Sequence, residues 1–542
     1  MRRALEEGPD AESRAELLLE LGLALAASAQ PGAAELLREA TEAAREPAAR
    51  AEAGVRAARA LVIAGHFAAA RSVCHAALSE AASMSQDAVA RLEVELVHVA
   101  RMSASSVEES RERIRHPAVD PSPLELWPVA VAFDGTLSGQ PARDVLALLR
   151  PSLTSGALPG SPPLITAAVV TLIWNEELEA ARGLCEGIAA IARPRGWLHT
   201  LMHESFLGSM VALRAGAARE AEADARFALE VKLRSEAPPE ATLWALAPLL
   251  DALVERDALG EAERTLEATG VGRPPRGELA SPLMLEVRAR LRCAQGRWTE
   301  AQRDLQGAAE DWEALRVEHP GVAQWRAGAA AVLAALGDLA GSERLAREHL
   351  SLAERVGTPG ALGAGLRALA RSAPRAEAIA LLERAVAILA RSPMRLEHTR
   401  ALCDLGAALR RAGQRREARE PLRQALDLAE RGGLVRLARQ AREELVAAGA
   451  RPRRAALSGP GALTAAEHRV AVLAAGGLTN REIAQQLFVT QRTVETHLGH
   501  AFQKLDIRSR DRLPAALGPV DGEAQATPES LRPTPQGVAA PG

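Results

Sequence analysis

Residues that break or turn a helix recur at a nearly constant interval through the second half of this chain. They stand at Gly216, Asp257, Gly296, Gly337, Ala373-Pro374 and Gly413. The interval is about 40 residues, and each break is followed by an amphipathic segment with helical periodicity. A hairpin of two such helices cannot bury its apolar face alone, so neighbouring hairpins must stack. The interval therefore predicts an all-α solenoid over residues 166–449.

Residues 1–102 show the same design in two copies. In each copy an apolar helical segment is followed by a break, at Gly32 or at Gly65-His66, and then by an alanine-rich helical segment. Residues 103–165 contain nine prolines, which exclude long helices and predict short helices and loops. The period of the repeats favours a tetratricopeptide-like α-solenoid as the fold class.

The C-terminal segment, residues 463–517, has a different pattern, with three short helices. Thr464 with Glu467, and Thr479 with Glu482, form T-x-x-E capping boxes that each predict a helix start. The apolar stripe of the third helix consists of Val494, Leu498, Ala501 and Leu505. Its outward positions are Gln491, Arg492, Glu495, Thr496, Gly499 and Gln503. A tight turn before a helix with a polar outer face predicts a helix-turn-helix.

Charge distinguishes this C-terminal region from the rest of the chain. Residues 451–517 carry ten basic and five acidic residues, a net charge of +5, whereas residues 1–450 carry a net charge of −6. A local excess of cations is what binding to nucleic-acid phosphates requires. The remaining composition, with 2% aromatic residues and no tyrosine, argues against an all-β protein.

Three motifs in this segment resemble a known family. They read L-T-x-x-E, G-x-T-N-x-E-I-A and T-V-x-x-H-x-x-x-x-x-x-K-L, and the last ends at Lys504-Leu505. Together they resemble the DNA-binding domain of LuxR-type transcriptional regulators. Region 4 of sigma factors shares L-T-x-x-E and E-I-A, but His497 and Lys504-Leu505 favour the LuxR type.

The resemblance implies double-stranded DNA as a partner and two sets of contact residues. Base contacts are expected at Glu495, Thr496 and Gly499. Phosphate contacts are expected at Thr479, Asn480, Arg492, Thr493 and Lys504. Some relatives have lysines at positions 495 and 499, so their preferred DNA sites cannot be transferred. Glu495 can accept a hydrogen bond from cytosine, and the Thr496 methyl can pack on thymine. The alternative for Glu495 is a solvent-exposed helix residue without a contact.

Members of this family dimerise through a fourth helix, which would begin here near Ser509. Pro514 falls in the second turn of that helix, where its ring would crowd a backbone carbonyl, so the length of the helix is open. The resemblance thus implies a homodimer on DNA, with RNA polymerase as a further partner. Residues 450–462 are expected to form a linker and residues 518–542 a disordered tail.

The chain as a whole resembles the C-terminal part of the large ATP-binding LuxR-type regulators, in which a P-loop ATPase precedes a tetratricopeptide-like region. No G-x-x-x-x-G-K-[ST] motif is present, and neither lysine, Lys232 nor Lys504, follows a glycine. We therefore expect no ATPase activity, whether the chain is a stand-alone regulator or begins downstream of a lost ATPase segment. His199, His203 and Glu204 lack the H-E-x-x-H order, and no catalytic, cofactor or metal site is predicted.

These observations predict a bacterial, cytoplasmic, non-enzymatic transcription regulator. Its helical repeats are expected to act as a sensor for an unknown effector ligand or protein. No stretch approaches the ~18 consecutive apolar residues of a membrane span, and the four cysteines are expected to be free thiols. The alternative function is an interaction scaffold whose helix-turn-helix docks a protein rather than DNA.

Overall fold

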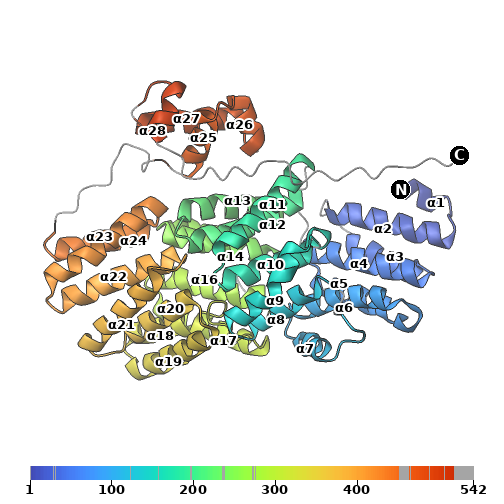
Figure 1. Ribbon diagram of the computed structural model, residues 1–542, viewed down its shortest axis with the longest axis horizontal. Helices are drawn as coiled ribbons and strands as arrows, with labels where there is room; N and C mark the ends of the chain where they lie inside the picture. Colours follow the sequence, from blue (N-terminus) through green and yellow to red (C-terminus); the bar gives the residue numbers. More distant parts are fainter. Residues whose placement is uncertain are drawn as a thin grey trace. The chain divides into compact units, whose positions relative to one another are not determined.

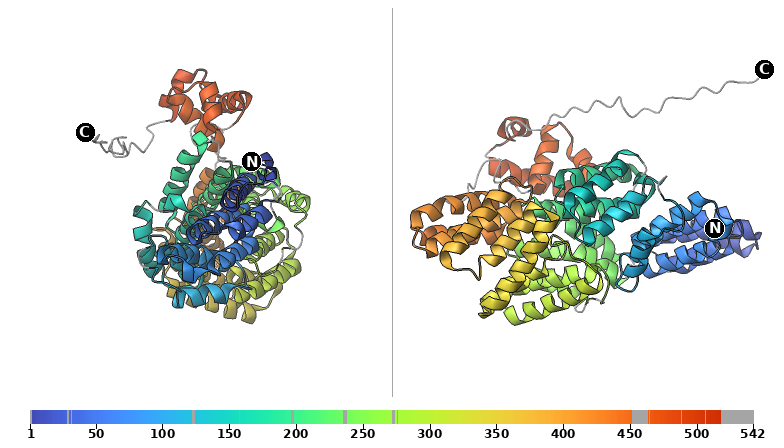
Figure 2. Two further views of the ribbon diagram at one scale, coloured as in Figure 1. Left: turned by 90° about the vertical axis from the view of Figure 1, so that its right-hand side faces the viewer. Right: turned by 60° about the horizontal axis from the view of Figure 1, so that its bottom comes forward.

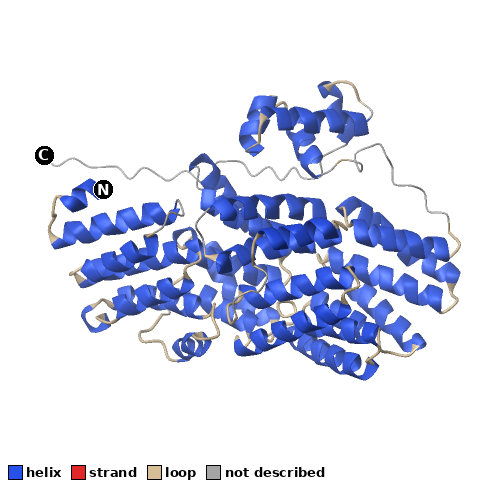
Figure 3. Cartoon of the chain, turned by 180° about the vertical axis from the view of Figure 1, so that it is seen from behind, coloured by secondary structure: helices blue, strands red, loops and turns tan. Residues whose placement is uncertain are grey.

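The computed structural model describes residues 2–517, apart from residues 28–29, 31, 122–123, 157, 196–197, 235–237, 272–273, 275, 451–462, 464, 488 and 506. Helices and loops make up this described part, in which no β-strand occurs (Figure 3). The all-α fold class is therefore confirmed. The chain divides into two compact units, residues 1–452 and 453–542. The predicted linker, from residue 451 onward, and the predicted tail lie outside the described residues.

The larger unit begins with a stack of short helical hairpins (Figure 1). Its elements are α1 (Arg2–Glu6), α2 (Ala11–Ala27), α3 (Ala33–Ala43), α4 (Pro47–Ala64), α5 (Phe67–Leu78), η1 (Ala81–Ser83) and α6 (Gln86–Ala100). Each helix from α2 to α6 packs on the next one along the chain, and α4 also packs on α2 and α6. Gly32 and Gly65 lie between the helices of these hairpins, both with positive φ.

The proline-rich stretch forms three shorter helices and a single turn. They are α7 (Val107–Arg115), α8 (Trp127–Leu137), α9 (Ala142–Thr154) and the 3-10 turn η2 (Leu158–Gly160). Pro128 lies in the first turn of α8, where a missing N–H costs nothing because that group has no intrahelical partner. Pro151 lies inside α9, which ends three residues later.

The rest of the larger unit is a regular two-layer array, which Figure 2 shows from two further directions. Its helices are α10 (Pro162–Trp174), α11 (Leu178–Ala192), α12 (Leu198–Arg214), α13 (Ala218–Arg234), α14 (Pro239–Glu255), α15 (Leu259–Ala268), α16 (Ala280–Ala294), α17 (Trp298–Ala314), α18 (Trp325–Leu336), α19 (Leu339–Val356), α20 (Pro359–Leu369), α21 (Arg375–Leu389), α22 (Arg395–Arg411), α23 (Arg415–Gly432) and α24 (Val435–Ala447), with the 3-10 turn η3 (Arg193–Arg195) after α11. The even-numbered helices pack against one another in sequence and form one layer, which we call the inner layer. This is a tetratricopeptide-like α-solenoid.

The recurring break residues lie in the tight turns inside the hairpins. Gly216, Gly296, Gly337 and Gly413 all adopt the left-handed conformation, with φ between 76° and 93°. Asp257 does so as well, with φ of 60°, a conformation that aspartate tolerates better than most residues. The spacing of about 40 residues therefore reflects a backbone requirement that recurs once in each hairpin.

The solenoid also closes on itself. Helix α12 contacts α22, and α14 contacts α24, although α22 and α24 come much later in the sequence, at the end of the repeat array. The turns meet so closely that a Cβ atom on Gly432 would lie 1.8 Å from the carbonyl oxygen of Gly216. Glu255 of α14, which is fully buried, accepts hydrogen bonds from Arg400 and Arg436 on α22 and α24. Burial acts to raise the pKa of Glu255, but these two guanidinium groups hold it at about 2.

Small and aromatic side chains fill the space between the layers. Alanines such as Ala221 and Ala225 are fully buried where helices approach closely, and Trp174 and Trp312 are the largest fully buried side chains. The four cysteines are free thiols, three of them buried. Among the described residues, no helix is both long enough and apolar enough to cross a lipid bilayer.

The smaller unit is a compact group of short helices with its own apolar core. Its elements are α25 (Ala465–Ala475), α26 (Asn480–Leu487), α27 (Gln491–Leu505), η5 (Arg510–Arg512) and α28 (Leu513–Leu517). Val470, Ile483, Val494 and Leu513 are among the buried core residues that these elements contribute, and Leu463, just before α25, packs with them.

Replacing Glu255 by glutamine should lower the free energy of unfolding of the solenoid by about 3 kcal/mol, because Arg400 and Arg436 lose the buried carboxylate that they share. The pKa of about 2 lies below the ordinary 4.5, so this contribution is complete above pH 4.5 and is lost as the pH falls toward 2. Denaturant unfolding followed by tryptophan fluorescence measures it, since all seven tryptophans lie in the larger unit.

Asp257→Asn provides the matched control for this experiment. Asp257 joins the same helices through Arg439, whose side chain is 55% exposed, and asparagine accepts the left-handed backbone. Its cost should stay below about 1 kcal/mol. Equal losses in the two variants would contradict the role of Glu255 in closing the solenoid.

Candidate nucleic-acid interface

The start of α26 is fixed by the capping box that the sequence predicts. The Glu482 carboxylate accepts hydrogen bonds from both the N–H and the hydroxyl of Thr479, each at 2.7 Å. In return the Thr479 hydroxyl accepts the Glu482 N–H at 3.3 Å. These hydrogen bonds lower the pKa of Glu482. The other predicted capping box pairs Thr464 with Glu467, and Thr464 lies outside the described residues.

The start of α27 is stabilised by an N-cap that was not predicted from the sequence. The Thr490 hydroxyl accepts the Thr493 N–H at 3.1 Å, and the two hydroxyls lie 2.8 Å apart. The sequence does contain a signal for this cap, because Thr490 stands directly before the helix. At that position a threonine hydroxyl can accept a hydrogen bond from an N–H group of the first helical turn, which has no partner within the helix. Both helices of the helix-turn-helix therefore begin at a threonine cap.

The two faces of α27 are as the periodicity predicts. The residues of the apolar stripe, Val494, Leu498, Ala501 and Leu505, are all buried. The predicted outward residues, Gln491, Arg492, Glu495, Thr496, Gly499 and Gln503, are all exposed. A single helix therefore presents a continuous polar face while the opposite face anchors it to α25 and α26.

The polar face of α27 offers a carboxylate, a methyl group and an open position. Glu495 lies 3.4 Å from the side-chain amide of Gln491, a contact that leaves most of the carboxylate to solvent. The Thr496 hydroxyl donates to the Arg492 carbonyl oxygen at 2.9 Å, so the hydroxyl is already occupied. A Cβ atom on Gly499 would meet nothing within 4 Å.

Two of the polar residues expected at phosphates also hold the domain together. The Lys504 ammonium donates to the buried Glu467 carboxylate at 2.6 Å, which links α27 to α25. The Asn480 side-chain oxygen accepts from Arg510 at 2.9 Å. Arg510 also donates to the carbonyl oxygens of Ala474 and Leu478 and so fixes the turn before α26. The structural role of Arg510 was not predicted, because its partners lie 30 to 36 residues earlier.

Four further arginines in the described part of this unit have exposed side chains. Arg481, Arg492, Arg508 and Arg512 are exposed, and none of them forms an ion pair within the described part of the chain. His497 is partly buried, and that burial lowers its pKa. His500 lies 3.7 Å from Glu467. Across the described residues, no group of three or more His, Cys, Asp or Glu side chains is arranged to hold a metal ion.

Pro514 is accommodated by a later helix start than the sequence suggests. Residues 510–512 form a 3-10 turn after Ser509, and the α-helical hydrogen bonding begins at Leu513. Pro514 is thus in the first turn of α28, where its missing N–H would have no intrahelical partner. The expected crowding in a second turn does not arise.

Comparisons with known proteins agree with this local geometry. Residues 461–514 match the family described as "Bacterial regulatory proteins, luxR family". Over 55 residues, 10% of this chain, the sequence is 49% identical to "Putative HTH-type transcriptional regulator" proteins Mb0914c of Mycobacterium bovis and Rv0890c of Mycobacterium tuberculosis, and the matched part spans only 6% of each relative. Residues 461–514 are therefore a LuxR-type helix-turn-helix domain. Yeast Tom70 is similar over 76% of this chain and 85% of its own, at 14% identity and a TM-score of 0.32.

Replacing Lys504 by methionine should lower the free energy of unfolding of the smaller unit by roughly 2 kcal/mol, because the buried Glu467 loses its lysine partner. Hydrogen exchange of the α25 and α27 amides in the full chain measures this change. Arg492→Met, on the exposed face of the same helix, should leave exchange unchanged. If both variants exchanged at the same rate as the unaltered protein, the Lys504–Glu467 pair would not stabilise the domain.

Proposed function

We propose that the protein is a sequence-specific DNA-binding transcription regulator, in which α27 enters the major groove of double-stranded DNA. The observation that carries this proposal is the exposed polar face of α27, which lies opposite a buried stripe and is flanked by exposed arginines that form no ion pair with another described residue. A DNA-binding helix must contact base edges and phosphates, and a polar helix face with exposed arginines beside it can do both.

The phosphate contacts are assigned to the beginnings of α26 and α27. Thr479, Asn480 and Thr493 lie at the N-termini of these helices, where the positive ends of the helix dipoles face outward. Arg492, exposed in the first turn of α27, supplies a full charge at the same edge. Lys504 keeps two further N–H donors beyond its bond to Glu467, so it can serve both the domain and a phosphate.

The base contacts are assigned to Glu495, Thr496 and Gly499. Glu495 is suited to accept a hydrogen bond from a cytosine amino group, because its carboxylate is exposed. The Thr496 hydroxyl is bound to the helix, so its methyl group is left for thymine. The open space at Gly499 permits close approach of the helix to a base pair. This set differs from relatives that carry lysines at positions 495 and 499.

The solenoid is assigned the role of a sensor or protein-interaction region in the cytoplasm. The cavity lined by its inner helices supports binding of an effector. The regulator is proposed to bind DNA as a homodimer and to act on RNA polymerase, without a cofactor. The competing function is a scaffold whose helix-turn-helix docks a protein, and DNA-binding measurements on variants of α27 distinguish the two.

Arg492→Ala should weaken binding to every DNA sequence and reduce the slope of log affinity against log salt by about one, because one phosphate contact is lost. Fluorescence anisotropy with labelled genomic fragments over a salt series measures both quantities. The control is Arg347→Ala, since Arg347 is an exposed solenoid residue paired with Glu343. DNA binding that is insensitive to Arg492→Ala would favour the protein-docking alternative.

Glu495→Gln should change which base is preferred without changing the salt slope. The carboxylate accepts only, whereas the amide also donates, so discrimination at one base pair should shift by about 1–3 kcal/mol. Genome-wide capture of bound DNA by the unaltered protein first defines the site, and selection from a randomised library then compares the variant. An unchanged preference would mean that Glu495 is only a solvent-exposed helix residue.

A further inference from the structure

We infer that the interior of the solenoid is a binding site for a small organic anion that carries carboxylate or phosphate groups. The inference deepens the sensor role in the proposed function and rests on it, but the site itself is argued from the solenoid alone. Its evidence is a large cavity, an excess of arginine in its wall, and buried donors that have no acceptor.

The cavity lies within the closed array and has a volume of about 770 Å³. All eight inner helices from α10 to α24 contribute to its wall. Its volume is within the range of about 300–1,000 Å³ that small-molecule sites occupy. Because α12 and α14 pack on α22 and α24, the wall is continuous around the cavity rather than an open concave surface.

Cations outnumber anions in this wall. The eight arginines are Arg214, Arg290, Arg367, Arg371, Arg375, Arg400, Arg411 and Arg436. The five carboxylates are Glu176, Glu255, Glu286, Glu397 and Asp404. Burial raises the pKa of Glu286 to about 7, so this carboxylate carries less than a full charge near neutral pH. Burial also raises the pKa of Glu176. The excess is opposite in sign to the net charge of −6 on residues 1–450.

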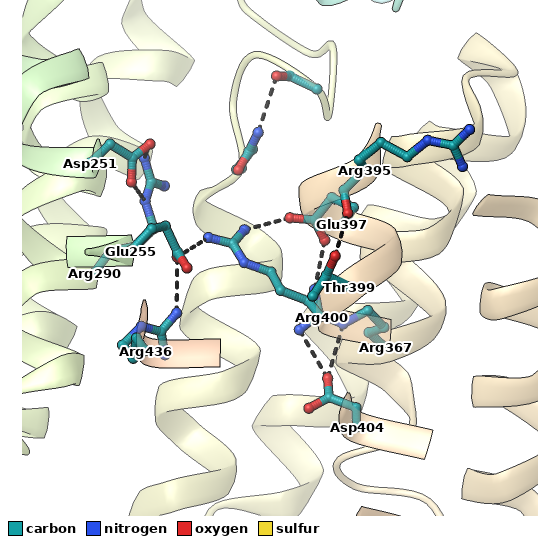
Figure 4. Close-up of polar contacts among 12 residues, drawn as sticks. Asp251, Glu255, Arg290, Arg367, Arg395, Glu397, Thr399, Arg400, Asp404 and Arg436 are labelled. Carbon is teal, nitrogen blue, oxygen red and sulfur yellow. Dashed lines mark hydrogen bonds and ion pairs between the residues drawn. The ribbon is translucent and has the colours of Figure 1, made fainter. Parts of the chain in front are cut away.

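The carboxylates hold several of these arginines in fixed orientations (Figure 4). Arg400 bridges Glu255, at 2.5 Å, and Glu397. Arg367 donates to Glu397 at 2.6 Å and to Asp404 at 2.9 Å. Because the guanidinium planes are positioned before any ligand arrives, less entropy is lost on binding.

Arg214 is a cation of this wall that forms no ion pair in the described structure, although the carboxylates of Asp251, Glu176 and Glu397 act on it from a distance. It lies at the end of α12, and its only hydrogen bond within the described structure is a long one, 3.4 Å, to the Met210 carbonyl oxygen of its own helix. Burial lowers its pKa to about 10, so it remains charged at neutral pH. A partly buried charge without a contacting counterion is costly, and an anionic ligand would supply that counterion.

Arg214 also lies at a junction between two cavities. A second cavity of about 110 Å³ shares Arg214, Arg290 and Arg400 with the larger one. These three arginines come from α12, α16 and α22, so an anion among them would join both sides of the closed array. Binding should therefore stabilise the closed form of the solenoid.

The rest of the wall is suited to the organic part of such a ligand. The indole N–H of Trp174, 2% exposed, finds no acceptor among the described residues. Trp298 contributes a partly exposed ring, and a run of alanines on α18 leaves the wall apolar between the charged groups. A charged end and an apolar body are thus both accommodated.

Isothermal titration calorimetry on the full chain, without DNA and at low salt, tests the inference. The probes are citrate and inorganic pyrophosphate, which separate carboxylate from phosphate recognition, and triethyl citrate is the uncharged control. We expect saturable binding of at least one anion up to about 10 mM and none of the ester. The Arg214→Met variant should bind that anion at least about tenfold more weakly.

Two further variants keep this test decisive. Arg347→Met, at an exposed ion pair outside the cavity, should bind as the unaltered protein does. Arg375→Gln removes an exposed arginine that lines the cavity and has no ion pair in the described structure, so it should weaken binding without risk to folding. Absence of binding by both anions, or binding insensitive to Arg214→Met and Arg375→Gln alike, would overturn the inference. Loss of DNA binding would not affect this result, so failure of the proposed function is distinguishable.

Discussion

The solenoid depends on the fact that one helical hairpin cannot bury its own apolar face. Stacking buries the apolar faces of the interior hairpins. The left-handed glycines Gly216, Gly296 and Gly337 give the successive hairpins similar short turns. The array then returns on itself, so α22 and α24 cover α12 and α14. The ion pairs of Glu255 form because this return brings Arg400 of α22 and Arg436 of α24 against α14.

The smaller unit must fold around a small apolar core and still leave one face of α27 exposed. Some of its polar residues stabilise the domain, and others remain exposed on that face. Arg510 is committed to holding the turn between α25 and α26, and Lys504 uses one of its N–H groups to hold α27 against α25. Arg492 and Glu495 make few contacts within the domain. The local excess of positive charge therefore overstates the number of cations available to a nucleic acid.

Local patterns in the sequence predicted the features that depend on local physics. The break residues, the Thr479–Glu482 cap and the buried stripe of α27 all follow from neighbours within a few positions. The closure of the solenoid did not, since Glu255 pairs with Arg400 and Arg436, 145 and 181 residues away, without any periodic signal. The cavity and its arginine excess were unpredictable for the same reason. Pro514 was misjudged because a 3-10 turn shifts the helix start.

The return of the array has a consequence for how the larger unit comes apart. In an open solenoid each repeat contacts only its neighbours, so repeats can fray one at a time from either end. Here the last helices are tied to the middle of the array, so α24 cannot detach without exposing α14. Helices α12 to α24 should behave as one cooperative block, while the hairpins α1–α6 keep the graded, end-first opening of an ordinary repeat protein.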